Sequence, residues 1–134
     1  MPENGTHVSG TSIDVRMPPG QLSGRMQEIM ARTSDKWCML IVALLRDRPL
    51  RYSELGRSID GISQRMLTLS LRKLERDGLI VRTVVPISPP QVEYALSDVG
   101  ISLLGLLELM VEWARSHESY IRDSRTRYDE SGGA

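Results

Sequence analysis

The sequence predicts a mainly α-helical fold with one small β-hairpin, and three observations support this fold class. Apolar residues recur at spacings of three and four along much of the chain, which is typical of the buried faces of helices. Residues 79–85 are rich in β-branched side chains, and residues 92–96 alternate like a returning strand after a proline-rich turn. The length of 134 residues, 40% of them hydrophobic, suits one domain with a modest core.

The N-terminal segment, residues 1–20, holds few large apolar side chains and ends in Pro-Pro-Gly, so we expect a flexible leader ahead of a domain at 21–121. The leader lacks the basic and apolar segments of a secretory signal. No apolar run in the chain reaches the roughly 18 residues that a membrane span needs. We therefore expect a cytoplasmic protein that makes no membrane contact.

Two helices are predicted directly after the leader. The first is marked by four apolar residues at helical spacing: Leu22, Met26, Ile29 and Met30. Ser34 is the expected N-cap of the second, and Asp35 is its first-turn acid. Residues 37–45 are apolar on all sides, which indicates a helix buried at the centre of the domain, and Pro49 ends it.

Two further helices come next and are joined by a tight turn. The first covers residues 52–59 with Ser53 as its expected N-cap, and the turn contains Gly61. Ser63 caps the second, which runs to about Asp77 and is followed by a helix-ending glycine at position 78. Its apolar stripe is formed by Leu67, Leu71 and Leu74. Two short helices, a tight turn and a β-hairpin in this order make a winged helix-turn-helix.

In such a motif the second helix enters the major groove of DNA and the first packs across it. The formal net charge of zero conceals an uneven distribution that suits this function. Residues 46–82 carry nine basic and five acidic side chains, whereas residues 83–134 carry four basic and eight acidic ones. The middle third of the chain is therefore the candidate face for double-stranded DNA.

Individual residue types suit the two kinds of DNA contact. Base edges are within reach of residues near the start of the second helix: Ser63, Gln64, Arg65, Thr68 and Leu69. Phosphates suit the cationic and hydroxyl side chains Arg51, Ser53, Arg72, Lys73 and Arg82, and the wing adds Ser88 and Gln91. The alternative for the charged residues 72–77 is a solvated helix face with no DNA contact.

The last predicted helix follows Ser97 and Asp98, and we expect its polar end after Ile121 to be frayed, with a polar tail at 122–134. Its apolar positions cover more than one face, so we expect a second subunit to cover them in a homodimer. The interface candidates are Leu22, Met26 and Ile29 of the first helix and Leu103, Leu106, Leu107, Met110 and Trp113 of the last. The alternative is that the last helix is buried within its own subunit.

The single cysteine and a few apolar residues each allow more than one interpretation. Cys38 is the only cysteine, so no intramolecular disulfide or cysteine-based zinc site forms in one chain, and its apolar neighbours favour a buried thiol over an oxidation sensor. Met30, Trp37 and Met39 are candidates for a small-molecule effector pocket, although core packing also explains them. We expect no catalytic constellation, no metal site and no cofactor.

Several sequence blocks, taken in order, carry a specific family resemblance. The chain resembles HxlR-type regulators, which are related to MarR-type proteins, over roughly residues 22 to 118. The similar blocks occur in order at Lys36-Trp37, 50–55 (LRYSEL), 61–68 (GISQRMLT), 71–80 (LRKLERDGLI) and 89–97 (PPQVEYALS). The resemblance implies a bacterial, dimeric winged-helix repressor or activator whose first and last helices pair the subunits. It implies a regulator acting on a pseudo-palindromic operator, with a small-molecule effector as a candidate signal.

Two departures from the family pattern change what we expect of the chain's redox sensing and of the charge on its wing. The cysteine that many members carry about a dozen residues before Lys36 is absent, because Gly24, Arg25 and Met26 occupy that region. Gln91 stands where a basic wing residue is common, so we expect a weakly charged wing. The competing hypothesis is a winged-helix protein-interaction module without DNA binding, and steep salt dependence of DNA binding distinguishes the two.

Overall fold

A computed structural model of the protein describes residues 7–8, 11–12 and 23–133 and divides the chain into two units, residues 1–32 and 33–134. In the first unit, β1 (His7–Val8) pairs antiparallel with β2 (Thr11–Ser12). The predicted first helix is confirmed as α1 (Gly24–Ala31), and the Ser23 side chain accepts a hydrogen bond from the Met26 N–H at 3.1 Å. Most of the predicted leader, and Leu22, lie outside the described residues.

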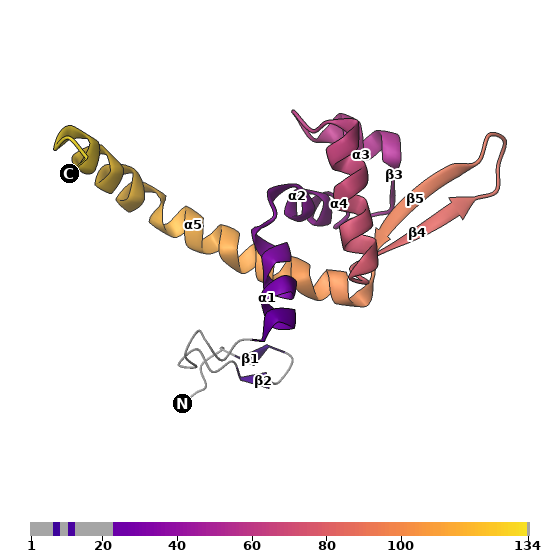
Figure 1. Cartoon of the computed structure of the whole chain (residues 1–134), viewed down its shortest axis with the longest axis horizontal. Coiled ribbons are helices and arrows are strands. Elements are labelled where there is room, and N and C mark those ends of the chain that lie inside the picture. The colour runs from indigo at the N-terminus through magenta and orange to yellow at the C-terminus, as the bar shows by residue number, and fades with distance from the viewer. Residues whose placement is uncertain (1–6, 9–10, 13–22, 134) are drawn as a thin grey trace. The chain divides into compact units, whose positions relative to one another are not determined.

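The second unit is a winged helix-turn-helix followed by a long helix (Figure 1). A 3-10 turn over Arg32–Ser34 precedes α2, and the elements follow in the order α2 (Lys36–Leu44), β3 (Leu50–Arg51), α3 (Tyr52–Ser58), α4 (Gln64–Arg76), β4 (Ile80–Val85), β5 (Gln91–Leu96) and α5 (Asp98–Glu130). The three strands form an antiparallel sheet in the order β3-β5-β4. The predicted hairpin is confirmed, with Ile80 opposite Leu96 and Val85 opposite Gln91. Strand β3 is an addition to the prediction.

Helix caps set the limits of the two longer helices of the motif region. Ser63 and Ser97 cap α4 and α5 as predicted, since their hydroxyls accept from the N–H groups of Met66 at 3.0 Å and Gly100 at 3.1 Å. Helix α4 ends at Arg76, and Gly78, just beyond the C-cap residue Asp77, has a φ of 74°. There the Leu79 N–H donates to the Leu74 carbonyl at 2.9 Å, the arrangement in which a left-handed glycine terminates a helix.

Two predicted caps were wrong. Helix α2 is capped by Asp35 rather than Ser34, because the Asp35 carboxylate accepts from the Cys38 N–H at 3.2 Å. Helix α3 begins at Tyr52, two residues earlier than an N-cap at Ser53 would allow, with Arg51 in the N-cap position. There the Glu54 carboxylate reaches back and accepts from the Arg51 N–H at 2.8 Å, which satisfies a donor that has no partner within the helix.

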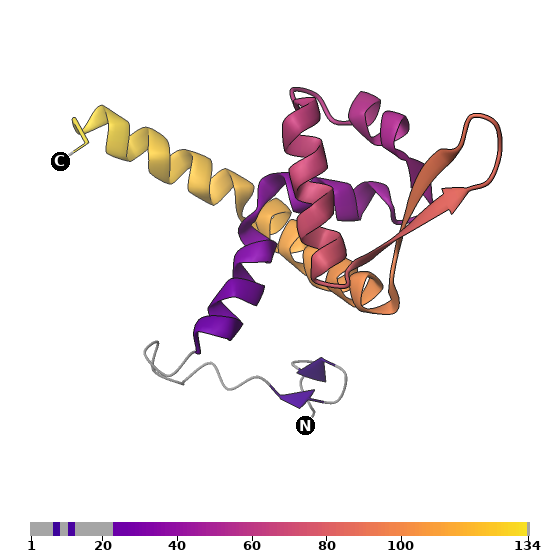
Figure 2. The same cartoon turned by 45° about the vertical axis from the view of Figure 1, so that its right-hand side comes forward.

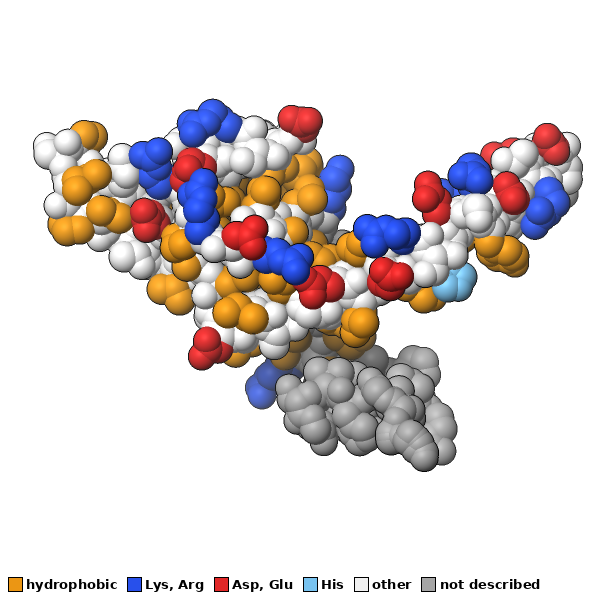
Figure 3. Space-filling view, turned by 180° about the vertical axis from the view of Figure 1, so that it is seen from behind, with side chains coloured by type: hydrophobic (Ala, Val, Ile, Leu, Met, Phe, Trp, Pro, Cys, Tyr) orange, Lys and Arg blue, Asp and Glu red, His pale blue; other side chains and the backbone are white. Residues whose placement is uncertain are grey.

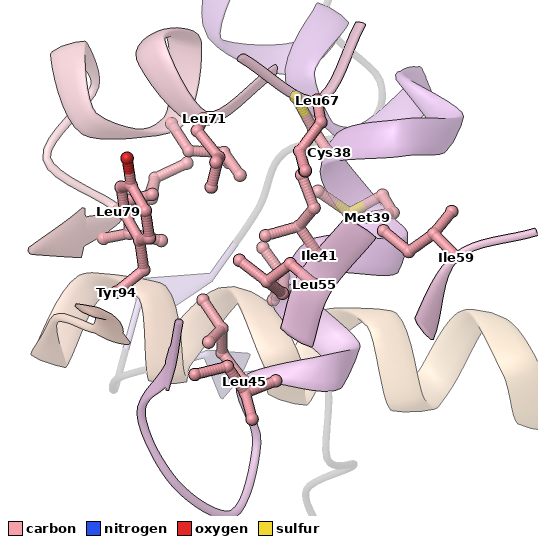
Figure 4. Packing of buried hydrophobic residues seen from close by; sticks show 14 residues of the cluster. Cys38, Met39, Ile41, Leu45, Leu55, Ile59, Leu67, Leu71, Leu79 and Tyr94 are labelled. Carbon is pink, nitrogen blue, oxygen red and sulfur yellow. The ribbon is translucent and has the colours of Figure 1, made fainter. Parts of the chain in front are cut away.

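The core lies between α2, α3, α4 and the sheet (Figure 4). Its buried side chains are Cys38, Met39, Ile41, Val42, Leu45, Leu50, Leu55, Ile59, Leu67, Leu71, Leu74, Leu79, Ile80 and Tyr94. Cys38 has no exposed surface, and its thiol lies 3.8 Å from the Ser70 carbonyl oxygen, so the prediction of a buried thiol is confirmed. Helix α2 is not buried on all sides as predicted, because Leu40 and Ala43 are exposed on one face.

Helix α5 starts against the core and then leaves it. Gly100 is buried near the helix start, whereas the part of α5 beyond Leu107 is almost entirely exposed (Figures 1 and 3). The expected fraying after Ile121 was wrong, because α5 continues to Glu130. Its end is stabilised by the N–H of Gly133, which donates to the Tyr128 carbonyl at 3.0 Å. Among the described residues, none of the helices combines the length and apolarity that crossing a membrane requires.

Candidate nucleic-acid interface

Helix α4 presents one face to the core and the opposite face to solvent, beside the projecting β4–β5 hairpin (Figure 2). The inward face is the predicted leucine stripe at positions 67, 71 and 74, which is buried. The outward face is a row at helical spacing, Arg65, Leu69, Arg72 and Arg76, whose side chains are all exposed. Within residues 23–133 the structure records no ion pair for these three arginines, so their charge is directed to solvent.

The predicted base-reading residues gather on this outward face. A shallow depression of about 480 Å³ is lined by Gln64, Arg65, Thr68, Leu69 and Arg72. Guanidinium and amide groups are the kinds of group that pair with base edges, and the exposed Leu69 offers an apolar surface between two cations. Ser63, in contrast, is engaged in capping α4 through its hydroxyl.

Helix α3 is tied to this face through Tyr52. Its hydroxyl lies 2.8 Å from the Thr68 hydroxyl and donates to the Gln64 carbonyl at 3.1 Å. Because these partners are 12 and 16 residues away, the contact holds the start of α4 against α3. Sequence reasoning gave Tyr52 no functional role, and no local pattern marks it.

Lys73 lies on the flank of α4 that faces α2, where its ammonium is 3.5 Å from the Asp35 carboxylate. Partial burial alone would raise the pKa of Asp35, but the N–H of Cys38 and the charge of Lys73 together hold that pKa below its usual value. Lys73 is therefore partly engaged within the protein and is a weaker phosphate candidate than the exposed Arg72.

The phosphate candidates around α3 are also engaged. The Arg51 guanidinium lies 3.6 Å from Glu54, whose carboxylate is also 3.3 Å from Arg48. The hydrogen bond from the Arg51 N–H and the nearby Arg48 charge hold the pKa of Glu54 below its usual value. Ser53 is exposed on the first turn of α3, and its hydroxyl does not cap the helix.

The wing supplies one cation. Arg82 and Arg72 line the same cavity of about 390 Å³ between α4 and the sheet, with Tyr52, Thr68, Leu71, Glu75 and Tyr94 completing its walls. Ser88 is exposed in the turn between the strands, and Gln91 is half-buried at the start of β5. Arg82 is thus positioned near the α4 face, whereas the tip of the wing carries no charged side chain.

The structure separates the predicted dimer residues into two groups. Leu103 and Leu107 are half-buried against their own core. Leu106, Met110 and Trp113 are 44, 45 and 59% exposed, so α5 is not buried within its own subunit. Met26 and Ile29 of α1 are exposed as well.

The predicted effector residues Met30, Trp37 and Met39 belong to different units of the structure. Met39 is buried in the core, and Met30 belongs to the separate N-terminal unit. Trp37 lines a cavity of about 220 Å³, together with Lys36, Leu40, Leu44, Ser58, Ile59 and Asp60. The Lys36 ammonium lies 4.7 Å from the centre of the Trp37 ring, a cation–π distance.

Arg76 is the second functional candidate that the sequence interpretation did not single out. Its position, eleven residues after Arg65, completes the outward row of α4 by simple helical spacing. Continuing the spacing of three and four residues from Arg65, Leu69 and Arg72 along the same helix face predicts Arg76.

A capped helix with an outward row of arginines, a preceding helix tied to its start and a β-hairpin beside it define a winged helix-turn-helix transcriptional regulator. The chain belongs to the HxlR-like helix-turn-helix family, whose profile matches residues 33–122.

Known relatives agree with this assignment. An uncharacterised HTH-type transcriptional regulator of Methanothermobacter thermautotrophicus is 45% identical over 89 residues, which are 66% of this chain and 68% of the relative. The regulator YtfH of Escherichia coli is 32% identical over 109 residues, 79% and 86% of the two chains. The solved structure of the reduced form of the regulator YodB from B. subtilis superposes with a TM-score of 0.63 at 32% identity, covering 70% of this chain and 92% of YodB. All three relatives are described as transcriptional regulators.

Proposed function

We propose that the protein is a homodimeric repressor that places two copies of α4 in successive major grooves of a pseudo-palindromic operator. The observation that carries this proposal is the outward row of Arg65, Leu69, Arg72 and Arg76, which presents cations and one apolar side chain on a capped helix. In this arrangement Gln64, Arg65, Thr68 and Leu69 contact base edges, and Arg72, Arg76 and Arg82 neutralise phosphates.

Binding to the DNA upstream of the gene tests the DNA-contact part of the proposal. Affinity is measured at several salt concentrations, and we expect a steep fall with rising salt because neutralised phosphates release counterions. Arg65→Ala should relax base preference, whereas Arg72→Ala should weaken binding to all sequences and reduce the salt slope by about two, one for each subunit of the dimer. Arg115→Ala on α5 is the control, since this exposed arginine lies outside the interface and should leave affinity unchanged. Equal binding by all four proteins would refute the assignment.

The exposed apolar side chains of α5 support the homodimer. Leu106, Met110 and Trp113 recur at spacings of four and three along one side of the helix, and a second copy would cover them. Two subunits would then place their α4 helices about 34–36 Å apart, one turn of DNA. Light scattering at micromolar concentration should give the dimer mass, and Met110→Asp should give the monomer. Arg115→Ala, on the opposite side of α5 by helical spacing, should remain dimeric. A monomeric parent protein would refute this part.

A small-molecule effector is the remaining element of the proposal. The cavity beside Trp37 is apolar on most of its wall and is smaller than the roughly 300–1,000 Å³ of drug-sized sites, so it suits only a small compound. Leu40→Trp would fill the cavity, and we expect operator binding by this variant to be insensitive to compounds that release the parent protein. Release of both proteins by the same compound would place the effector elsewhere.

One observation favours a second function, a protein-interaction module. Val81, Val84 and Ile87 of the wing are about half-exposed, and the wing tip has no charged side chain that would attract phosphate. Under this alternative the parent protein would bind DNA weakly and without sequence preference, so the salt and base-preference measurements decide between the two functions.

A further inference from the structure

The hydrogen-bond chain that joins Tyr52, Thr68 and Gln64 has a definite direction. The Tyr52 hydroxyl has a single proton, and the Gln64 carbonyl oxygen, at 3.1 Å, can only accept. If that proton were directed elsewhere, two lone-pair-bearing oxygens would face each other at hydrogen-bond distance. The Tyr52 proton therefore goes to Gln64.

The direction of the remaining bond follows. The hydroxyl oxygens of Tyr52 and Thr68 are 2.8 Å apart, so one of them donates to the other. Since the proton of Tyr52 is already committed, Thr68 is the donor. A threonine hydroxyl has one proton and two acceptor lone pairs, so Thr68 keeps acceptor capacity and has no proton left for another partner.

Thr68 is half-buried and lines the depression on the outward face of α4 between Gln64 and Leu69. We propose that Thr68 is a specificity-determining residue that acts as a hydrogen-bond acceptor only, and that it selects an amino-bearing base, adenine or cytosine, at the strand position it faces. This inference rests on the proposed function, DNA binding through α4. The amino groups of adenine and cytosine are the donors in the major groove, whereas thymine and guanine present oxygen acceptors there.

The hydrogen bond between Thr68 and Tyr52 gives a physical reason for the rejection of thymine and guanine. To donate to a base oxygen, Thr68 must withdraw its proton from Tyr52, which leaves the hydroxyl oxygen of Tyr52 without its donor. The parent protein thus loses one hydrogen bond for each one it forms. An unsatisfied polar contact of this kind, or a single mismatched base, lowers affinity by about tenfold.

The DNA probe is obtained by letting the parent protein select duplexes from a pool with a random central region, at one fixed salt concentration. The best selected duplex is then remade with every single-base change, and affinities are measured for the parent, Tyr52→Phe, Thr68→Val, Thr68→Ser and the control Tyr120→Phe. Tyr52→Phe removes the acceptor of the Thr68 proton. Thr68→Val removes the hydroxyl at nearly constant shape, whereas Thr68→Ser keeps it.

We expect one position in each half-site where the parent prefers adenine or cytosine by about tenfold over thymine or guanine. At that position Tyr52→Phe and Thr68→Val should each reduce the preference to less than about threefold, while Thr68→Ser and Tyr120→Phe retain it. Thermal melting identifies a variant that fails to fold. If Tyr52→Phe does not fold, the contrast between Thr68→Val and Thr68→Ser decides.

Two negative results are distinguishable. A parent protein that selects no sequence from the pool overturns the proposed function, and this inference with it. A parent that selects a sequence, but whose preferences at every position are the same in Tyr52→Phe or in Thr68→Val, overturns this inference alone.

Discussion

Gly100 is the position where the packing of α5 is most sharply testable. A Cβ atom at this residue would lie 2.1 Å from the carbonyl oxygen of Leu79 and 3.2 Å from the Leu96 side chain. The Leu79 oxygen cannot yield freely, because it also accepts the N–H of Ser97 at 3.1 Å. Gly100→Ala must therefore push the start of α5 away from the base of the wing by about 1 Å.

The expected free-energy change combines three contributions. Forcing a methyl group into a packed site costs about 3 kcal/mol, and a disturbed Ser97–Leu79 hydrogen bond adds about 1 kcal/mol. The higher helix propensity of alanine offsets about 1 kcal/mol. A net loss of about 3 kcal/mol corresponds to a fall in melting temperature of roughly 10–15 °C for a domain of this size.

Thermal unfolding is followed by circular dichroism. All variants are measured at one protein concentration, because the melting temperature of a dimer depends on concentration. The matched control is Gly105→Ala in the same helix, where a Cβ meets no atom within 4 Å. This control should melt at the parent temperature or slightly above it. If Gly100→Ala melts within about 2 °C of the control, the close approach of α5 to Leu79 is wrong.

Three other substitutions or reagents test the interior around α4. Because the folded pKa of Asp35 is depressed, Asp35→Asn should be less stable than the parent at pH 7. In urea titrations the difference should begin to shrink below about pH 4, near the pKa of an unfolded Asp, and should be lost as the pH falls through the lower folded pKa. Cys38 should react with a thiol reagent in the native protein at least a hundredfold more slowly than in urea, and rapid native labelling would contradict its burial. Among the described residues the buried Ser70 hydroxyl has no hydrogen-bond partner, so Ser70→Ala should raise the free energy of unfolding by about 1 kcal/mol. Ser116→Ala, at an exposed helical serine, gives the propensity effect alone and should change it by less than half as much.

Features determined by neighbouring residues were predictable from the sequence. The caps at Ser63 and Ser97 and the helix end at Gly78 were predicted correctly, because each depends on a side chain or a φ value within a few residues. The cap of α2 was missed by one position, since Ser34 and Asp35 both suit the role and only the structure shows which carboxylate or hydroxyl reaches the Cys38 N–H.

Features that depend on distant partners were not predictable. Strand β3 has two residues, too few to show a period, and exists because Leu50 pairs with Tyr94. The end of α5 was misjudged because its polar composition resembles that of a frayed tail. Its exposed polar side chains still permit a continuous helix, and the glycine at position 133 satisfies a terminal carbonyl. The assignment of Tyr52 likewise required the fold.

The two faces of α4 separate residues that stabilise the fold from residues that contact DNA in the proposed complex. The leucines at 67, 71 and 74 are buried, so changes there remove packing that holds the domain together. Leu69 is exposed between Arg65 and Arg72, and a polar substitution at this site leaves the core untouched. The proposed dimer repeats this face twice on one operator, so a single change at Leu69 acts in both half-sites. Under the proposed function, base preference can therefore change by substitution on one face of α4 without loss of the fold, whereas Thr68 is constrained because its hydroxyl is hydrogen-bonded to Tyr52.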